Sequence, residues 1–130
     1  MYLFDTNICI ALLKDKDLTL RNRLQKSNPE EFALCSIVKA ELLYGARHSQ
    51  QIDHNLRKLE DFFAPFISLG FDDAAAQHYG IIRSILAKTG QPIGSNDLLI
   101  ASIALVNDAT LITRNHREFA RVPGLRWEEW

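Results

Sequence analysis

Short apolar runs alternate along the chain with longer stretches in which apolar residues recur at helical spacing. Four of the runs have the length and composition of buried strands: residues 1–4, 32–35, 66–69 and 109–113. A fifth, short strand is predicted near residues 125–127, after Pro123 and Gly124. The pattern therefore supplies the strands of one small sheet.

Amphipathic helices are predicted between the strands. The clearest apolar stripe is Ile52, Leu56, Leu59 and Phe63, spaced by four, three and four residues, and it ends before Pro65. The other helices are predicted from Ile8 onward, over residues 18–24 up to a turn at Asn28-Pro29, after an N-cap at Ser36, over residues 72–88 up to Gly90, and from Asn96 to about Val106 after an N-cap at Ser95.

Strands that alternate with helices indicate a parallel sheet, because parallel neighbours need a crossover connection that a helix usually provides. Helices would cover both faces of this sheet, which suits strands that are apolar on both sides. With 130 residues and neither a repeat nor a linker, the chain is expected to be a single α/β domain over residues 1–130.

The composition is that of an ordinary globular protein, with 47% hydrophobic and 24% charged residues. The formal net charge of −1 gives no overall basic field, so attraction to a nucleic acid would have to come from local patches. Cys9 and Cys35 lie in apolar runs and are expected to be buried free thiols in a reducing compartment. Without a charged leader or a membrane-length apolar stretch, we expect a cytoplasmic protein.

Three acidic residues follow predicted strands or lie in helices beside them. Asp5 ends the first strand, Glu41 lies one turn into the helix after the second, and Asp97 occupies the first turn of the helix before the fourth. Functional groups gather beyond the carboxyl ends of strands in open parallel sheets. Each acid alone is also explained as a helix cap, a first-turn acid or a solvated residue. Their apolar sequence neighbours favour a shared site.

Convergence of the three carboxylates would require a cation. Two carboxylates about 5 Å apart repel by roughly 3 kcal/mol at an effective dielectric constant near 20. All-oxygen ligands that leave room for water select a hard ion, so Mg²⁺ is expected, with Mn²⁺ as a substitute. None of the four histidines has the spacing of a zinc protease site.

With these motifs the sequence resembles the PIN-domain nucleases, and among them the VapC-type toxins of bacterial toxin–antitoxin pairs. The matching segments follow one another along nearly the whole chain: residues 3–7 (LFDTN), 36–45 (SIVKAELLYG), 92–101 (PIGSNDLLIA), 113–119 (TRNHREF) and 122–125 (VPGL). The resemblance implies a three-layer α/β/α sandwich with a mostly parallel sheet of four to five strands. It also implies magnesium-dependent hydrolysis of RNA phosphodiester bonds.

The resemblance assigns metal binding to Asp5 and Asp97 and makes Glu41 the third acid, as a ligand or as the base for the attacking water. Many PIN domains have a fourth aspartate at the position of Asn115, so one strongly bound ion is expected in the absence of substrate. Glu118 is a candidate for the missing charge, although its place in a terminal turn fits a solvated or capping acid better.

Small polar residues beside the acids are expected to hold the carboxylates or ligated waters in place: Thr6, Asn7, Ser36, Thr113 and Asn115. Capping and turn formation explain Asn7 and Ser36 equally well. Candidate RNA contacts are the basic residues after the fourth strand and the first helix, namely Arg114, Arg117, Lys14 and Lys16.

The resemblance also implies partners. A small VapB-type antitoxin is expected to block the site with a basic side chain, and initiator transfer RNA is the substrate that the family suggests. A homodimer is expected, with Tyr44, Phe62 and Phe63 as candidates for an apolar interface, although core packing explains each of them as well.

Two other functions fit part of the pattern. A haloacid-dehalogenase-like phosphatase also has an acid after its first strand, but it needs a second aspartate two residues on, where this chain has Asn7. A PIN-like module that binds RNA or protein without cutting is the other alternative. The intact Asp5, Glu41 and Asp97 argue against that alternative.

Overall fold

The computed structural model describes residues 1–130 and contains five strands, seven α-helices and one 3-10 helix. In chain order they are β1 (Tyr2–Phe4), α1 (Thr6–Lys14), α2 (Leu18–Gln25), the 3-10 helix η1 (Pro29–Glu31), β2 (Phe32–Cys35), α3 (Ser36–Arg47), α4 (Ile52–Phe63), β3 (Ile67–Leu69), α5 (Asp73–Lys88), α6 (Ser95–Val106), β4 (Thr110–Ile112), α7 (His116–Phe119) and β5 (Trp127–Glu128). Each predicted strand and helix has a counterpart among these elements.

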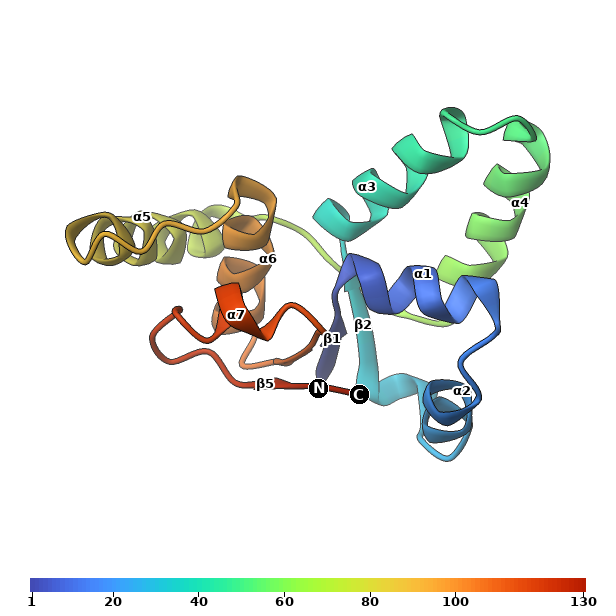
Figure 1. Ribbon diagram of the computed structural model, residues 1–130, viewed down its shortest axis with the longest axis horizontal. Coiled ribbons are helices and arrows are strands. Elements are labelled where there is room, and N and C mark those ends of the chain that lie inside the picture. The colour runs from blue at the N-terminus through green and yellow to red at the C-terminus, as the bar shows by residue number, and fades with distance from the viewer.

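The strands form one sheet in the order β3-β2-β1-β4-β5, and every neighbouring pair is parallel. The chain first moves from β1 toward β3 and then crosses to β4 and β5. Because parallel crossovers are right-handed, these two directions place helices on opposite faces. Figure 1 shows α1 to α4 on one side of the strands and α5 to α7 on the other. The predicted α/β/α sandwich is confirmed.

The central strands are buried on both faces, as their continuous apolar runs predict. β2 is buried over all four of its residues, and Leu3 and Leu111 are completely inaccessible. α6 has six buried residues, which explains its nearly continuous apolar sequence. Cys9 and Cys35 are free and buried, as predicted. None of the helices combines the length and the hydropathy that crossing a membrane would take.

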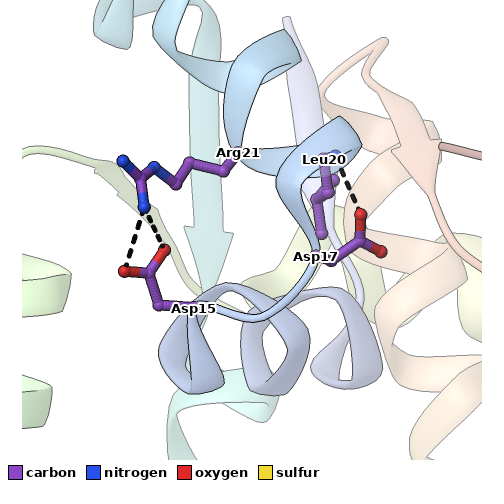
Figure 2. Close-up of polar contacts among 4 residues, drawn as sticks. All are labelled: Asp15, Asp17, Leu20 and Arg21. Carbon is purple, nitrogen blue, oxygen red and sulfur yellow. Dashed lines mark hydrogen bonds and ion pairs between the residues drawn. The ribbon is translucent and has the colours of Figure 1, made fainter.

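Polar contacts fix the turn between α1 and α2 (Figure 2). Asp15 ends α1 in the left-handed region, with φ at 52°, and both of its carboxylate oxygens accept hydrogen bonds from Arg21 at 3.3 Å. Asp17 caps α2 by accepting a hydrogen bond from the Leu20 amide at 3.0 Å. The two caps set the direction of α2 relative to α1, whose first turn contributes to the site described below.

Several predicted boundaries are wrong by one or two residues. Ser36 and Ser95 are the first residues of their helices and not N-caps; Cys35 and Gly94 hold the cap positions and make no side-chain cap bond. In both places the chain turns into the helix one residue earlier than a capping hydroxyl would require. The last strand lies at Trp127–Glu128 and not at 125–127, because its register is set by pairing with β4.

Candidate active site

Asp5 lies at the carboxyl end of the central strand and is held by two hydrogen bonds. It precedes α1, and its Oδ1 accepts from the Thr6 amide at 2.7 Å. Its Oδ2 accepts from the hydroxyl of Thr113, which follows the neighbouring strand β4, also at 2.7 Å. Burial raises the pKa of Asp5, and the two hydrogen bonds oppose that rise. Asp5 is therefore a buried, pre-oriented carboxylate.

Glu41 is linked to Asp5 through Thr6. It lies in α3, which follows β2, the strand that pairs with β1 on the side away from β4. Its Oε1 accepts a hydrogen bond from the Thr6 hydroxyl at 3.1 Å, and the side chain is half-buried. Thr6 thus links Asp5, through its amide, to Glu41, through its hydroxyl.

Asp97 belongs to a pair of carboxyl groups bridged by an amide. The Nδ2 of Asn115 donates to Asp97 Oδ2 at 3.1 Å and to Glu118 Oε2 at 3.4 Å. Burial, a hydrogen bond with Glu118 and the charge of Asp5 all raise the pKa of Asp97. The same hydrogen bond from Asp97 lowers the pKa of Glu118. The shared hydrogen bond therefore moves the two pKa values apart, upward for Asp97 and downward for Glu118.

Electrostatic coupling joins these acids into one site. The charges of Asp5, Glu118 and Glu41 each raise the pKa of Asp97, so all four carboxyl groups share one edge of the sheet. Gly94 lies against the pair, since a Cβ on this residue would come within 3.7 Å of both Asp97 Oδ2 and Glu118 Oε2. We call this set of four acids the acidic cluster.

Glu118, a candidate for the missing charge whose place in a terminal turn favours a solvated or capping acid, belongs to the site. It lies beside Asp97, and its side chain is half-buried. The spacing of three residues between Asn115 and Glu118 was an available signal, because it puts both side chains on one face of a helical turn. That turn is α7, which is only four residues long.

The donor set of the acidic cluster fits a hard divalent cation. Its ligands are carboxylate oxygens. Burial raises the pKa of both Asp5 and Asp97, and the charges of Asp5, Glu118 and Glu41 add to the rise at Asp97, so a bound cation would favour the ionised form of both groups. No three of the acids are close enough together to enclose an ion by themselves. Mg²⁺ does not require such a cage, since it usually binds one or two carboxylates and keeps several waters.

The predicted supporting residues divide into two groups. Thr6, Thr113 and Asn115 all donate hydrogen bonds to carboxylates of the acidic cluster. Asn7 and Ser36 are exposed, and neither makes a side-chain hydrogen bond to an acid, because the first turns of α1 and α3 direct them to solvent. For these two, the structure provides no contact that would support the predicted role.

The candidate RNA contacts also differ from one another. Arg114 is already engaged: one guanidinium nitrogen pairs with Asp17, and its Nε donates to the backbone oxygen of Trp130 at 3.1 Å. Arg117 is exposed and belongs to none of the ion pairs. Lys14 and Lys16 are exposed at the end of α1 and just after it. Arg114 therefore stabilises the fold, whereas Arg117, Lys14 and Lys16 belong to no ion pair and are free to contact RNA.

A groove of about 380 Å³ opens beside the acidic cluster between α1, α3 and α4. Its lining includes Thr6 and Glu41 at one end and Lys14 and Lys58 along its length, with apolar residues such as Leu59 between them. We call it the α1–α3–α4 groove. It is an apolar channel that leads to an acidic group and is flanked by two lysines.

The candidates for an apolar interface have unequal exposure. Tyr44 is 70% exposed and stacks on His48, whereas Phe62 and Phe63 are half-buried. Phe62 packs edge-on against Phe66, with ring centroids 5.3 Å apart. Tyr44 alone keeps the exposure that an interface residue needs, and its place in a dimer stays a prediction.

Comparison with known proteins decides the family. The sequence matches the family described as PIN domain over residues 2–125. The chain belongs to the PIN-domain family. This PIN domain is 41% identical over 129 residues to the "tRNA(fMet)-specific endonuclease VapC" of Shigella flexneri, covering 99% of this chain and 97% of that protein. It is 40% identical over 131 residues to "Ribonuclease VapC2" of Rickettsia felis, covering 100% of this chain and 98% of that protein.

Solved structures agree with the sequence relatives. The PIN domain superposes on a chain of DNA-bound VapBC from Salmonella typhimurium with a TM-score of 0.93 and 38% identity, covering 99% of this chain and 97% of that chain. It superposes on a chain of VapBC2 from Rickettsia felis bound to a promoter DNA fragment with a TM-score of 0.91 and 39% identity, covering 99% and 98%. The predicted resemblance to the VapC group of PIN-domain ribonucleases is confirmed.

Proposed function

We propose that this protein is a divalent-metal-dependent endoribonuclease, formed by a single PIN domain over residues 1–130, and the toxin of a toxin–antitoxin pair. The observation that carries the proposal is the acidic cluster, in which Asp5, Glu41 and Asp97 come from three separate segments and the charges of Asp5 and Glu41 both raise the pKa of Asp97. A structural cap or a solvated acid has no need of such convergence.

Bound Mg²⁺, or Mn²⁺ in its place, would supply Lewis-acid stabilisation of the phosphate oxygens and acidify a water molecule. The residues of the chain prepare this chemistry. Asp5 and Asp97 would hold the cation: Asp5 is oriented by hydrogen bonds from Thr6 and Thr113, and Asp97 by one from Asn115. Because burial and neighbouring carboxyl groups raise the pKa of Asp97, a bound cation would favour its ionised form.

Glu41 is proposed as the general base for the attacking water. It is half-buried, and Thr6 occupies only Oε1, which leaves Oε2 free to accept a proton. Glu118 is proposed to supply the fourth charge in place of the aspartate that many PIN domains have at position 115. Asn115 then orients Asp97 and Glu118 and is not itself a charged ligand.

Transfer RNA is the proposed substrate class, and initiator transfer RNA the proposed target, because the relative from Shigella flexneri is named for that specificity. We propose that the protein acts in the cytoplasm, where this substrate lies. With a net charge of −1, RNA must be held by local cations such as Arg117, Lys14 and Lys16.

A VapB-type antitoxin is the proposed partner, since the similar solved structures are VapBC complexes. The α1–α3–α4 groove suits an apolar antitoxin segment whose basic side chain reaches Glu41 at the groove's end. A homodimer is proposed as well, with Tyr44 as the exposed aromatic residue.

The direct test is cleavage of total bacterial transfer RNA by the purified parent, Asp5→Asn, Glu41→Gln and Asp97→Asn proteins, followed by sequencing of the RNA ends. We expect one dominant cut by the parent in Mg²⁺, none in EDTA and none by the variants. RNA left whole by the parent in both Mg²⁺ and Mn²⁺ would reject the nuclease and favour a PIN-like module that binds without cutting.

A further inference from the structure

A second cavity, of about 260 Å³, lies on the α5 side of the sheet. It is bounded by α5, by the first turn of α6 and by the segment that joins them, which Figure 1 shows running back alongside α5. Its lining includes Tyr79, Arg83 and Ala87 from α5, Pro92 and Ile93 from the joining segment, and Ser95 from α6. We call it the α5–α6 pocket.

The α5–α6 pocket combines an aromatic ring, apolar walls and one cation. Arg83 donates a hydrogen bond to the Tyr79 hydroxyl at 2.9 Å, and its guanidinium lies 5.8 Å from the centre of the tyrosine ring. Arg83 takes part in none of the ion pairs of the molecule. Its positive charge is therefore uncompensated, and most of its donors are free for an anion.

The α5–α6 pocket shares a wall with the acidic cluster. The joining segment lines the pocket at Pro92 and Ile93, and its next residue, Gly94, lies against Asp97 and Glu118. The backbone oxygen of Pro92 accepts a hydrogen bond from Arg121 at 2.9 Å, which fixes this wall in place. Two of the pocket residues, Ser95 and Leu98, belong to the same first turn of α6 as Asp97.

We propose that the α5–α6 pocket binds one nucleotide of the substrate RNA next to the scissile phosphate, with its base against Tyr79 and a phosphate on Arg83. At about 260 Å³ the pocket is smaller than the roughly 300–1,000 Å³ of pockets for drug-sized ligands, so it has room for the base of one nucleotide and none for a duplex. Unpaired RNA bases are bound by stacking on aromatic rings and guanidinium planes. The inference rests on the proposed nuclease function.

The test measures binding separately from cleavage. In the Asp5→Asn background, which leaves the pocket intact, a labelled 12-nucleotide single-stranded RNA of mixed sequence is titrated in Mg²⁺ and followed by anisotropy. Arg83→Gln is expected to raise Kd at least about 10-fold, the value of one charge-assisted hydrogen bond. Ala87→Phe, which fills the pocket and keeps Arg83, is expected to do the same.

Two matched controls accompany these variants. Arg57→Gln removes an exposed arginine from α4 on the opposite layer, and Ala74→Phe adds the same ring to an exposed position on the face of α5 opposite Tyr79, Arg83 and Ala87. Both are expected to leave Kd unchanged. Equal Kd values for Arg83→Gln and Arg57→Gln would overturn the proposal, as would the absence of saturable binding to Asp5→Asn.

Cleavage kinetics and the oligomeric state in solution provide two further measurements. With active protein and transfer RNA, Arg83→Gln is expected to raise KM several-fold more than it lowers kcat. If the parent cuts transfer RNA but Arg83→Gln has the parent's KM, the pocket proposal fails and the nuclease function stands. A change from dimer to monomer in Ala87→Phe with unchanged RNA affinity would assign the pocket to a second copy of the chain and overturn the proposal.

Discussion

Asp5 and Asp97 have the same side chain, and burial raises the pKa of both, yet their neighbours differ. Asp5 is buried and receives two hydrogen bonds from neutral donors, the Thr6 amide and the Thr113 hydroxyl. Asp97 lies beside Glu118, and the charges of Asp5 and Glu41 raise its pKa further. Asn115 is the one hydrogen-bond donor to its carboxylate. The first carboxylate is pre-organised by the fold, whereas the second is left with a charge that only a proton or a cation can balance.

Substitution of Asp97 should show this difference most strongly. Asp97→Asn is expected to reduce cleavage by on the order of 100-fold or more, because it removes a cation ligand. The same change should leave the metal-free fold as stable as the parent or more stable, since a neutral amide avoids the cost of burying an ionisable group beside other acids. Initial rates on transfer RNA and the Tm in EDTA measure the two effects.

Asp73→Asn is the matched control for Asp97→Asn, because Asp73 is also a first-turn acid but is exposed on α5. It should change neither rate nor Tm. A metal-free Asp97→Asn protein that melts well below the parent would make Asp97 a structural cap and remove the contrast with Asp5.

Removal of a neutral hydrogen-bond donor from Asp5 should lower the stability of the fold, in contrast to Asp97→Asn. Thr113→Val keeps the shape of the buried side chain but removes two hydrogen bonds, the one that the hydroxyl donates to Asp5 Oδ2 and the one that it accepts from the Asn115 amide. We expect the free energy of unfolding to fall by about 1–3 kcal/mol, the cost of an unsatisfied buried group. Urea denaturation measures it. Thr110→Val, at a half-buried position of β4, is the control, and an equal loss in both variants would contradict the account.

The pH dependence of stability should follow Asp97 in the metal-free protein. Its pKa is raised above the ordinary 3.8, so from about pH 4 upward the unfolded chain releases a proton that the folded chain retains. Stability is therefore expected to fall as pH rises through the raised pKa, with Asp5 acting in the same direction. Tm values in EDTA, from about pH 4 up through the raised pKa of Asp97, measure the effect. Asp97→Asn should flatten the curve, and an unchanged slope in that variant would locate the titrating group elsewhere.

The smallest effect is expected at the link between Asp5 and Glu41. Thr6→Val removes the hydroxyl that donates to Glu41 but keeps the amide that donates to Asp5. Stability should fall by only about 0.5–1.5 kcal/mol. The rate should fall several-fold, through kcat more than through KM, because the proposed base is less well oriented. A kcat equal to that of the parent would remove Thr6 as a positioning residue.

The part of the site nearest the sheet could be predicted from the sequence. Continuous apolar runs located the strands, and parallel strands bring their carboxyl ends to one edge, so Asp5 could be expected near Glu41 and Asp97. Thr113 also followed from this reasoning, since it comes directly after β4, the neighbour of β1. Local patterns suffice where strand pairing sets the geometry.

The part of the site built by connections could not be predicted in the same way. Glu118 reaches Asp97 because a four-residue helix and Gly94 meet, and neither has a periodic signal. Arg114 was expected to bind RNA, but it pairs with Asp17, a residue 97 positions away in the sequence. Contacts between such distant connections depend on the packed fold and not on local spacing.

The most direct test of the central claim is the change in Tm that Mg²⁺ produces in the parent and in Asp5→Asn. A ligand that binds only the folded state stabilises it by about 2.7 kcal/mol at 100 times its Kd. If the acidic cluster holds the cation, Mg²⁺ should raise the Tm of the parent by several degrees and that of Asp5→Asn much less. Equal shifts in the two proteins would show that the cation binds elsewhere and would contradict the proposed site.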